Sequence, residues 1–158
     1  MNDCPCGLTL PYARCCGRYH GGEIPADAEA LMRSRYSAFV RHDYGYLWRT
    51  LHPAHPDRTA GIAVSRWVET VRASSQALEF QRLRVLAVGG PDVEDIAHVL
   101  FHVSVKDGRS DASFAERSRF ARDRGRWKYL GGTVLMNREL PQPIDALSFD
   151  RFEHAARR

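Results

Sequence analysis

The first half of the chain places apolar residues at helical spacing. Three stretches show this pattern, at 28–40, 44–51 and 65–72. Asp27 stands where an N-terminal cap belongs before the first stretch, and Ser65 does so at the start of the third. His52-Pro53 ends the second stretch, because proline cannot continue a helix. We therefore expect three helices in this half of the chain.

From Leu78 onward the hydrophobic period changes to two. Apolar and polar residues alternate in four runs, at 78–88, 96–105, 112–122 and 126–135. Turn signals rich in Gly, Pro and Asp separate these runs. Four long strands joined by tight turns predict an antiparallel meander, and the preceding helices must cover one of its faces. The expected fold is α+β, with helices packed on a sheet of about four strands.

Composition and charge fit one cytoplasmic domain with a small appendage. The 158 residues are 44% hydrophobic and 27% charged, which excludes wholesale disorder. A net charge of +4 permits acidic partners, but only Lys106 and Lys128 are lysines and the arginines form no basic run. No apolar run approaches the roughly 18 to 20 residues of a membrane-spanning helix, and the first four residues lack the features of a signal peptide. We expect a cytoplasmic protein without membrane insertion.

All the cysteines lie within the first sixteen residues, as Cys4, Cys6, Cys15 and Cys16. In a chain without an export signal, clustered thiols favour metal ligation over disulfides. Four thiolates complete the tetrahedral shell of Zn²⁺ and leave no open coordination position, so the cluster predicts one structural Zn²⁺. A redox dithiol and incidental cysteines are the alternatives.

The cysteine segment resembles the SEC-C motif, a small zinc-binding module. The resemblance rests on Cys4-Pro5-Cys6-Gly7, Tyr12 and Cys15-Cys16-Gly17. In the Sec-translocase ATPase such a module recruits a chaperone partner with the help of basic residues between its cysteine pairs. Here Arg14 is the one basic residue in that interval, and Leu8 stands where the motif usually has Ser. The resemblance therefore implies the metal site, while the chaperone partner does not carry over.

Beyond the cysteines, the chain resembles the YchJ family of bacterial proteins. The matching segments are Leu31-Met32-Arg33-Ser34-Arg35-Tyr36-Ser37-Ala38-Phe39, Tyr46-Leu47, His52-Pro53, Glu116-Arg117-Ser118-Arg119-Phe120 and Gly125-Arg126-Trp127-Lys128-Tyr129. This resemblance implies a SEC-C zinc module at 1–22 and a domain like nuclear transport factor 2 (NTF2) at 26–137. Such a domain is a curved antiparallel sheet wrapped by helices into a cone. We expect 138–158 to be a partly ordered tail.

Polar residues caught between the first long helix and the sheet are candidate ligand contacts. One interpretation is a buried ion pair of Arg33 or Arg35 with Glu116, which would fasten the helix to the sheet. The other is a pocket in which an arginine binds an anionic small ligand bidentately while an aromatic ring packs on it. The candidates are Arg33, Arg35, Tyr36, Glu116, Ser118, Arg119 and Trp127.

Three histidines are candidate acid or base groups, because imidazole titrates near neutrality. His98 and His102 share parity on the second expected strand, and His52 precedes a proline. A catalytic role would require one of them to lie within hydrogen-bonding reach of a second titratable group in a cavity. No nucleophile motif or phosphate loop accompanies them. A surface or core role is the alternative for each.

The leading hypothesis is a non-enzymatic adaptor. In it the zinc module, flexibly joined at Gly21-Gly22, docks a protein partner, and the cone offers a second surface or a small-ligand pocket. One alternative is a small-molecule hydrolase, isomerase or dehydratase that uses the cone cavity. Another is a nucleic-acid or ribosome-associated protein that binds through Arg14, Arg18 and the sheet arginines. The fold resemblance also implies that the outer sheet face could form a homodimer.

Overall fold

The change of hydrophobic period falls at the junction between helices and sheet. The computed structural model describes residues 3–158, so Met1 and Asn2 of the expected module lie outside the described residues. The antiparallel sheet has the order β1-β2-β4-β5, and a short β3 pairs with β2. Its strands are β1 (Leu78–Gly89), β2 (Ala97–Asp107), β3 (Ser110–Asp111), β4 (Phe114–Asp123) and β5 (Arg126–Met136). The expected α+β fold is confirmed.

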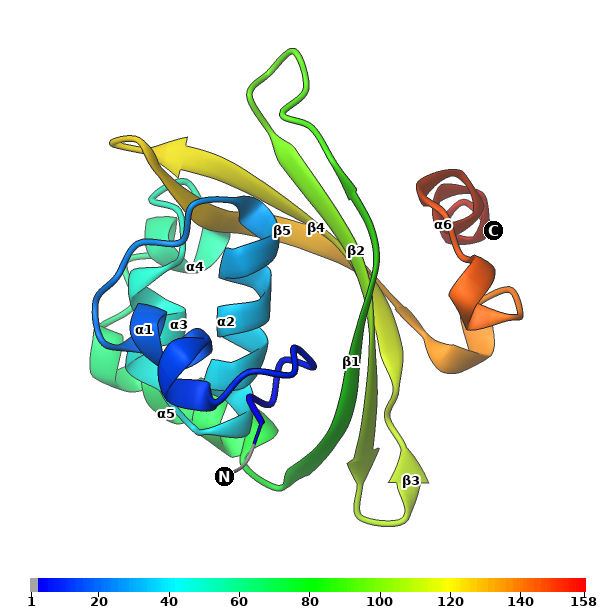
Figure 1. Ribbon diagram of the computed structural model, residues 1–158, viewed down its shortest axis with the longest axis horizontal. Helices are drawn as coiled ribbons and strands as arrows, with labels where there is room; N and C mark the ends of the chain where they lie inside the picture. Colours follow the sequence, from blue (N-terminus) through cyan, green and yellow to red (C-terminus); the bar gives the residue numbers. More distant parts are fainter. Residues whose placement is uncertain (1–2) are drawn as a thin grey trace.

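The helices of the first half lie on one face of this sheet (Figure 1), which we call the inner face. They are η1 (Tyr12–Arg14), α1 (Cys16–His20), α2 (Ala28–Val40), α3 (Tyr44–Arg49), α4 (Pro56–Thr59) and α5 (Val64–Ser75). Asp27 caps α2 as expected, by accepting from the Ala30 amide. The expected cap Ser65 lies inside α5, which Ala63 precedes without a side-chain cap.

Side-chain alternation divides the strands between two cores. Val99, Phe101 and Val103 of β2 pack with α2 in the core of the inner face, whereas Leu100 belongs to a second core on the opposite, outer face. Register shifts in β1 and between Arg119 and Phe120 of β4 mark bulges. Bulges bend and twist a strand, and here they accompany a sheet that curves around α2 (Figure 1).

The C-terminal segment is a folded cover and not the partly ordered tail expected from the sequence. It forms η2 (Asn137–Glu139), η3 (Ile144–Ala146) and α6 (Phe149–Ala156), and α6 lies across the outer face of the sheet (Figure 1). Phe152 is fully buried there and Ser148 caps the helix. The segment is ordered because it buries apolar surface that Leu100, Ala115 and Leu135 leave on that face. No helix of the described residues is long and apolar enough to cross a membrane.

Candidate functional site

The four cysteines form one buried cluster. Their Sγ atoms all lie within 4.8 Å of one another, and Sγ of Cys6 and Sγ of Cys15 are 3.5 Å apart. A tetrahedral Zn²⁺ with bonds of about 2.3 Å to sulfur requires neighbouring sulfurs about 3.8 Å apart. All four are free thiols, so no disulfide competes for them. The cluster therefore fits a tetrahedral metal ion.

Backbone contacts bring the two cysteine pairs together. The Cys4 amide donates to the Leu10 carbonyl over 2.7 Å, which folds the segment before the second pair back on the first. Gly17 follows the second pair because a Cβ there would lie 2.7 Å from the Tyr12 carbonyl oxygen. The glycine after Cys15-Cys16 is thus a steric requirement of the cluster.

The thiols share negative charge unequally. A hydrogen bond from Cys16 lowers the pKa of Cys6 to about 5, and that same contact raises the pKa of Cys16. Burial raises the pKa of Cys15 to about 12. Several thiolates cannot accumulate in this buried space without a cation to compensate their negative charge. A bound metal ion would supply that positive charge.

His20 supports the cluster from outside its ligand set. Its Nδ1 lies 2.5 Å from the Tyr12 hydroxyl, and its Nε2 lies 2.8 Å from the carbonyl oxygen of Ser34 in α2. Both ring nitrogens are therefore engaged, which leaves the four cysteines as the residues that could hold a metal ion.

The cysteine module is docked on α2, which corrects the expectation of a mobile module on a Gly-Gly hinge. Nη1 of Arg33 donates to the Cys6 carbonyl over 2.8 Å, and Sγ of Cys4 lies 3.6 Å from Oγ of Ser37. The cysteines also share one apolar core with Leu31. One side of α2 contacts the cysteine module, so the opposite side of the helix is free to line a cavity.

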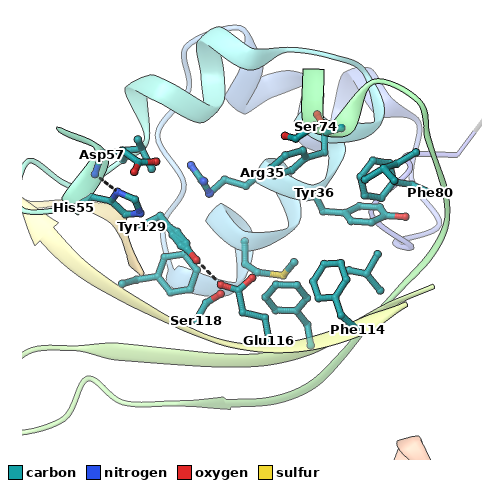
Figure 2. Close-up of a pocket in the computed structure, with 18 of the residues that line it drawn as sticks. Arg35, Tyr36, His55, Asp57, Ser74, Phe80, Phe114, Glu116, Ser118 and Tyr129 are labelled. Carbon is teal, nitrogen blue, oxygen red and sulfur yellow. Dashed lines mark hydrogen bonds between the residues drawn. The ribbon is translucent and has the colours of Figure 1, made fainter. Parts of the chain in front are cut away.

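That cavity, of about 370 Å³, lies between α2, α5 and the inner face of the sheet (Figure 2). Most of its wall is apolar, and five phenylalanines contribute to it: Phe39, Phe80, Phe101, Phe114 and Phe120. Arg35, His55, Asp57, Glu116, Ser118 and Tyr129 are the main polar groups. A mostly apolar cavity with a few convergent polar groups is typical of a small-molecule site.

Arg35 reaches into this cavity from α2 (Figure 2). Its Nη1 donates to the Leu47 carbonyl over 2.9 Å and to Oγ1 of Thr50 over 2.6 Å, and its guanidinium carbon lies 4.6 Å from the centre of the Tyr129 ring. Burial lowers the pKa of Arg35, although a guanidinium remains charged at neutral pH. Among residues 3–158, no carboxylate lies within ion-pair distance of it.

Glu116 faces the same cavity from β4. The Tyr129 hydroxyl donates a short hydrogen bond to Oε1 of Glu116 (Figure 2). Burial raises the pKa of the Glu116 carboxyl above its usual range, in spite of that bond and of the Arg35 charge. Gly132 of β5 provides the space, because a Cβ at that position would collide with the Glu116 carboxylate. The cavity thus contains a buried carboxyl held in a defined position.

His55 and Asp57 complete the cavity, and sequence reasoning did not identify either of them. The Asp57 amide donates to Nδ1 of His55 over 3.1 Å, and burial lowers the pKa of His55, so the neutral ring carries its proton on Nε2. Oδ2 of Asp57 accepts from Nε1 of Trp67 over 2.9 Å. The one local signal is the repeated His-Pro of 52–56, in which His55 caps the short helix α4.

An edge contact places this segment beside the sheet. The Tyr129 amide of β5 donates to the Thr50 carbonyl, and the His52 amide donates to the Tyr129 carbonyl, each over 2.8 Å. These bonds place Leu51 beside Tyr129 in a parallel bridge. His55 thereby comes to lie at the edge of the Tyr129 ring, with ring centres 5.6 Å apart.

A family model for the middle NTF2-like domain of YchJ matches residues 27–132, which is most of the helix-and-sheet domain just described. The chain belongs to the YchJ family. Similar proteins include a UPF0225 protein of Xanthomonas campestris pv. campestris, 41% identical over 82% of this chain and 92% of the relative. A UPF0225 protein of Xanthomonas oryzae pv. oryzae is 38% identical over 82% of this chain and 93% of its own length. The expected family is confirmed.

Two solved structures resemble this YchJ-family chain along its length. A SEC-C motif-containing protein from Rhodopseudomonas palustris gives a TM-score of 0.70 at 31% identity, covering 85% of this chain and 99% of that one. A SEC-C motif-containing protein from Psychrobacter arcticus gives 0.70 at 25% identity, covering 99% and 96%. These likenesses support the assignment of the four-cysteine segment as a SEC-C-like metal module on an NTF2-like cone.

The other predicted pocket residues of this YchJ-family protein fall into two groups. Arg35, Tyr36, Glu116 and Ser118 all line the cavity. Arg33 faces the cysteine module, Arg119 is exposed, and Trp127 packs beneath the Arg122 guanidinium. The expected ion pair between Arg35 and Glu116 is not formed within the 4.0 Å that defines one, because each group is held by other partners.

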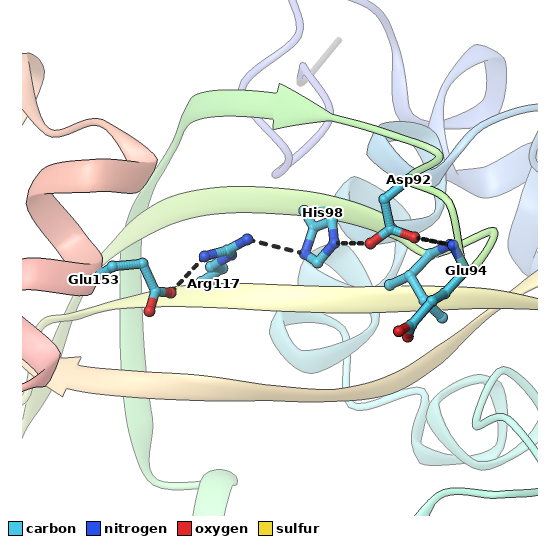
Figure 3. Close-up of polar contacts among 6 residues, drawn as sticks. Asp92, Glu94, His98, Arg117 and Glu153 are labelled. Carbon is cyan, nitrogen blue, oxygen red and sulfur yellow. Dashed lines mark hydrogen bonds and ion pairs between the residues drawn. The ribbon is translucent and has the colours of Figure 1, made fainter.

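The predicted acid or base histidines lie away from the cavity. His98 and His102 point to the outer face, since the inward positions of β2 are Phe101 and Val103. His98 lies in a chain of polar contacts from Asp92 through Arg117 to Glu153 (Figure 3). His52 lies at the edge, 3.4 Å from the Arg122 carbonyl. None of the three can act on the Glu116 carboxyl, so we assign them no acid or base role there.

Proposed function

We propose that the protein binds a small molecule in the cone cavity and that its cysteine module is a structural Zn²⁺ centre. The carrying observation is Arg35, a charged group in an otherwise largely apolar cavity without a carboxylate in ion-pair contact. Placing an uncompensated charge in such surroundings opposes folding. A ligand that contacts the guanidinium would offset that cost, which is why the site supports binding better than a purely structural role.

The metal module contributes to this function through α2. Arg33, Ser34 and Ser37 contact the module, whereas Arg35 and Tyr36 line the cavity from the same helix. The four cysteines would hold the Zn²⁺ with no coordination position open to a substrate. The ion therefore fixes the helix that carries the binding residues.

Native mass spectrometry of gently purified, full-length protein tests this proposal. After incubation with a cellular metabolite extract, we expect one zinc ion and one retained small molecule per chain. Val103→Phe places a larger side chain at a buried position of the cavity wall, and it should abolish retention. Val134→Phe is the matched control, since Val134 is 50% exposed and does not line the cavity. Wild-type protein that retains no small molecule would contradict the proposal.

A second candidate function is the docking of a partner protein by the module. Leu8 and Leu10 are 40% and 44% exposed in the loop between the cysteine pairs, which places two large apolar side chains in solvent. A partner recovered with wild-type protein should be lost with the Leu8→Ser/Leu10→Ser double variant. It should be kept with Val93→Ser, an exposed position far along the chain. Equal recovery with both variants would contradict docking at this loop.

A further inference from the structure

The orientation of the Arg35 guanidinium limits what the cavity can hold. Its Nη1 is engaged by the Leu47 carbonyl and the Thr50 hydroxyl, which fixes the plane of the group. Among the described residues, neither Nε nor Nη2 has a hydrogen-bond partner. Nε and Nη2 form the side edge of the guanidinium, and their parallel N–H bonds match the two oxygens of a carboxylate. A planar anion is the group that this edge fits.

The rest of the cavity determines the body of the ligand. Phe39, Phe80, Phe101 and Phe114 line it, and the volume of about 370 Å³ lies at the small end of typical ligand sites. An aromatic or branched aliphatic group would bury its surface against these rings. The expected ligand therefore combines one carboxylate with an apolar body.

Charge balance adds a condition on Glu116. The groups that face its carboxyl are the Tyr129 hydroxyl from β5, Ser118 on the same strand and the Arg35 guanidinium from α2. His55 and Asp57 line the cavity from the 51–57 segment. An anion on Arg35 would neutralise the guanidinium charge that favours the ionised form of Glu116. The bound state would then add the ligand's carboxylate to a cavity that already contains the carboxyl groups of Glu116 and Asp57. A carboxylate added beside the buried Glu116 carboxyl favours proton uptake by one of the two.

Resting on the proposed function, we propose that the ligand is a monocarboxylic acid with an apolar body. The ligand's carboxylate binds the Nε–Nη2 edge of Arg35, and Glu116 takes up a proton from solvent when the ligand binds. In the complex, Glu116 is a neutral acid that keeps its contact with the Tyr129 hydroxyl. The cavity thus selects its ligand by charge at one end and by apolar surface at the other.

Isothermal titration calorimetry on full-length, zinc-loaded protein tests the ligand class. The probes are 3-phenylpropanoate, 3-phenylpropanamide and 3-phenylpropylamine, which share one body and differ in the head group. We expect the carboxylate to bind at least about tenfold more tightly than the amide, and the amine to give no measurable binding. Tighter binding of the amide or the amine would overturn this inference while leaving small-molecule binding intact. Failure of all three probes, with a retained metabolite of another class, would overturn it as well.

Two arginine-to-lysine variants locate the carboxylate. Arg35→Lys keeps the positive charge and removes the bidentate edge, so affinity for 3-phenylpropanoate should fall about tenfold or more. Arg66→Lys makes the same change at an exposed position of α5 that does not line the cavity, and it should leave affinity unchanged. Equal loss in both variants would overturn the assignment to Arg35.

The same titration measures the proton. Repeating it in buffers of different ionisation enthalpy gives the number of protons taken up, which should be positive for wild type and close to zero for Glu116→Gln. The variant should still prefer the carboxylate probe over the amide. Proton uptake that persists unchanged in Glu116→Gln, or its absence in wild type, would overturn the role given to Glu116.

Discussion

The two faces of the sheet differ in whether their charged side chains have partners of opposite charge. On the outer face, Arg117 pairs with Glu153 of α6, Arg84 pairs with Asp145, and His98 pairs with Asp92. On the inner face, Arg35 and Glu116 line one cavity without reaching each other. Both sets lie on or against the same sheet, so the difference comes from what covers each face.

This difference separates structural polar groups from candidate binding groups. A charged side chain that the chain itself neutralises contributes to attachment, as the outer-face pairs do for the C-terminal segment. A charged side chain left facing a cavity opposes folding and remains available for a ligand. The role of a polar residue on these strands therefore depends on its partners and not on its residue type alone.

The largest expected effect comes from the metal module, which supports the inner-face helix. Cys15→Ser should remove stoichiometric zinc and lower the free energy of unfolding by about 4 kcal/mol, because the free energy of metal binding no longer contributes to folding. Elemental analysis and thermal unfolding measure both. Thr9→Ser, an exposed change in the same loop, is the control and should keep one zinc per chain. Stoichiometric zinc retained in Cys15→Ser would contradict the four-cysteine ligand set.

A slightly smaller loss is expected on the outer face. Phe152 is the residue of α6 that is fully buried against the sheet, so Phe152→Ala should cost about 3 kcal/mol in denaturant unfolding. His154→Ala on the exposed side of the same helix should change stability by less than about 0.5 kcal/mol. Affinity for 3-phenylpropanoate, measured at a temperature where the variant is folded, should not change. A variant as stable as wild type would show that the outer cover adds nothing to the fold.

Glu116→Gln should raise stability, in contrast to the two preceding substitutions. The folded-state pKa of Glu116 is raised above its unfolded value near 4.5, so its contribution is most favourable below that value and is lost as pH rises through the folded pKa. Glutamine does not ionise, so the variant does not lose stability as pH rises. Its side-chain oxygen still accepts the hydrogen bond from the Tyr129 hydroxyl. It should be about 1–2 kcal/mol more stable than wild type at neutral pH, and the difference should vanish in acid. Thermal unfolding across pH measures this, and a variant less stable at neutral pH would contradict it.

Much of the inner face could be predicted from the sequence, because strand parity and helix spacing are local signals. The alternation that joins Glu116 and Ser118 on one face holds, and Arg35 lies on the cavity side of α2. His55 and Asp57 could not be found this way, since the pairing of Thr50 and His52 with Tyr129 at the edge of the sheet brings them to the cavity.

The outer cover was missed for a related reason. The helix at Phe149–Ala156 has eight residues, too short to be stable by its own propensity, and it exists through packing on the sheet. The family resemblance supplied the cone and the metal module, but it carried no information on which polar groups find partners within the chain. Those partners depend on tertiary contacts between residues far apart in sequence, as between Arg117 and Glu153.

The smallest effect is expected for Glu153→Gln, which makes the same Glu-to-Gln change on the outer face. The Arg117 and Glu153 side chains are 27% and 36% exposed, so solvent screens their pair, and Glu153→Gln should cost no more than about 0.5–1 kcal/mol. Raising the salt concentration should shrink this loss, whereas the gain from Glu116→Gln should respond much less because the inner carboxyl is removed from solvent. Chemical unfolding by urea at low and high salt measures both variants side by side. If the two substitutions shift stability in the same direction at neutral pH, the contrast between paired outer charges and unpaired inner charges fails.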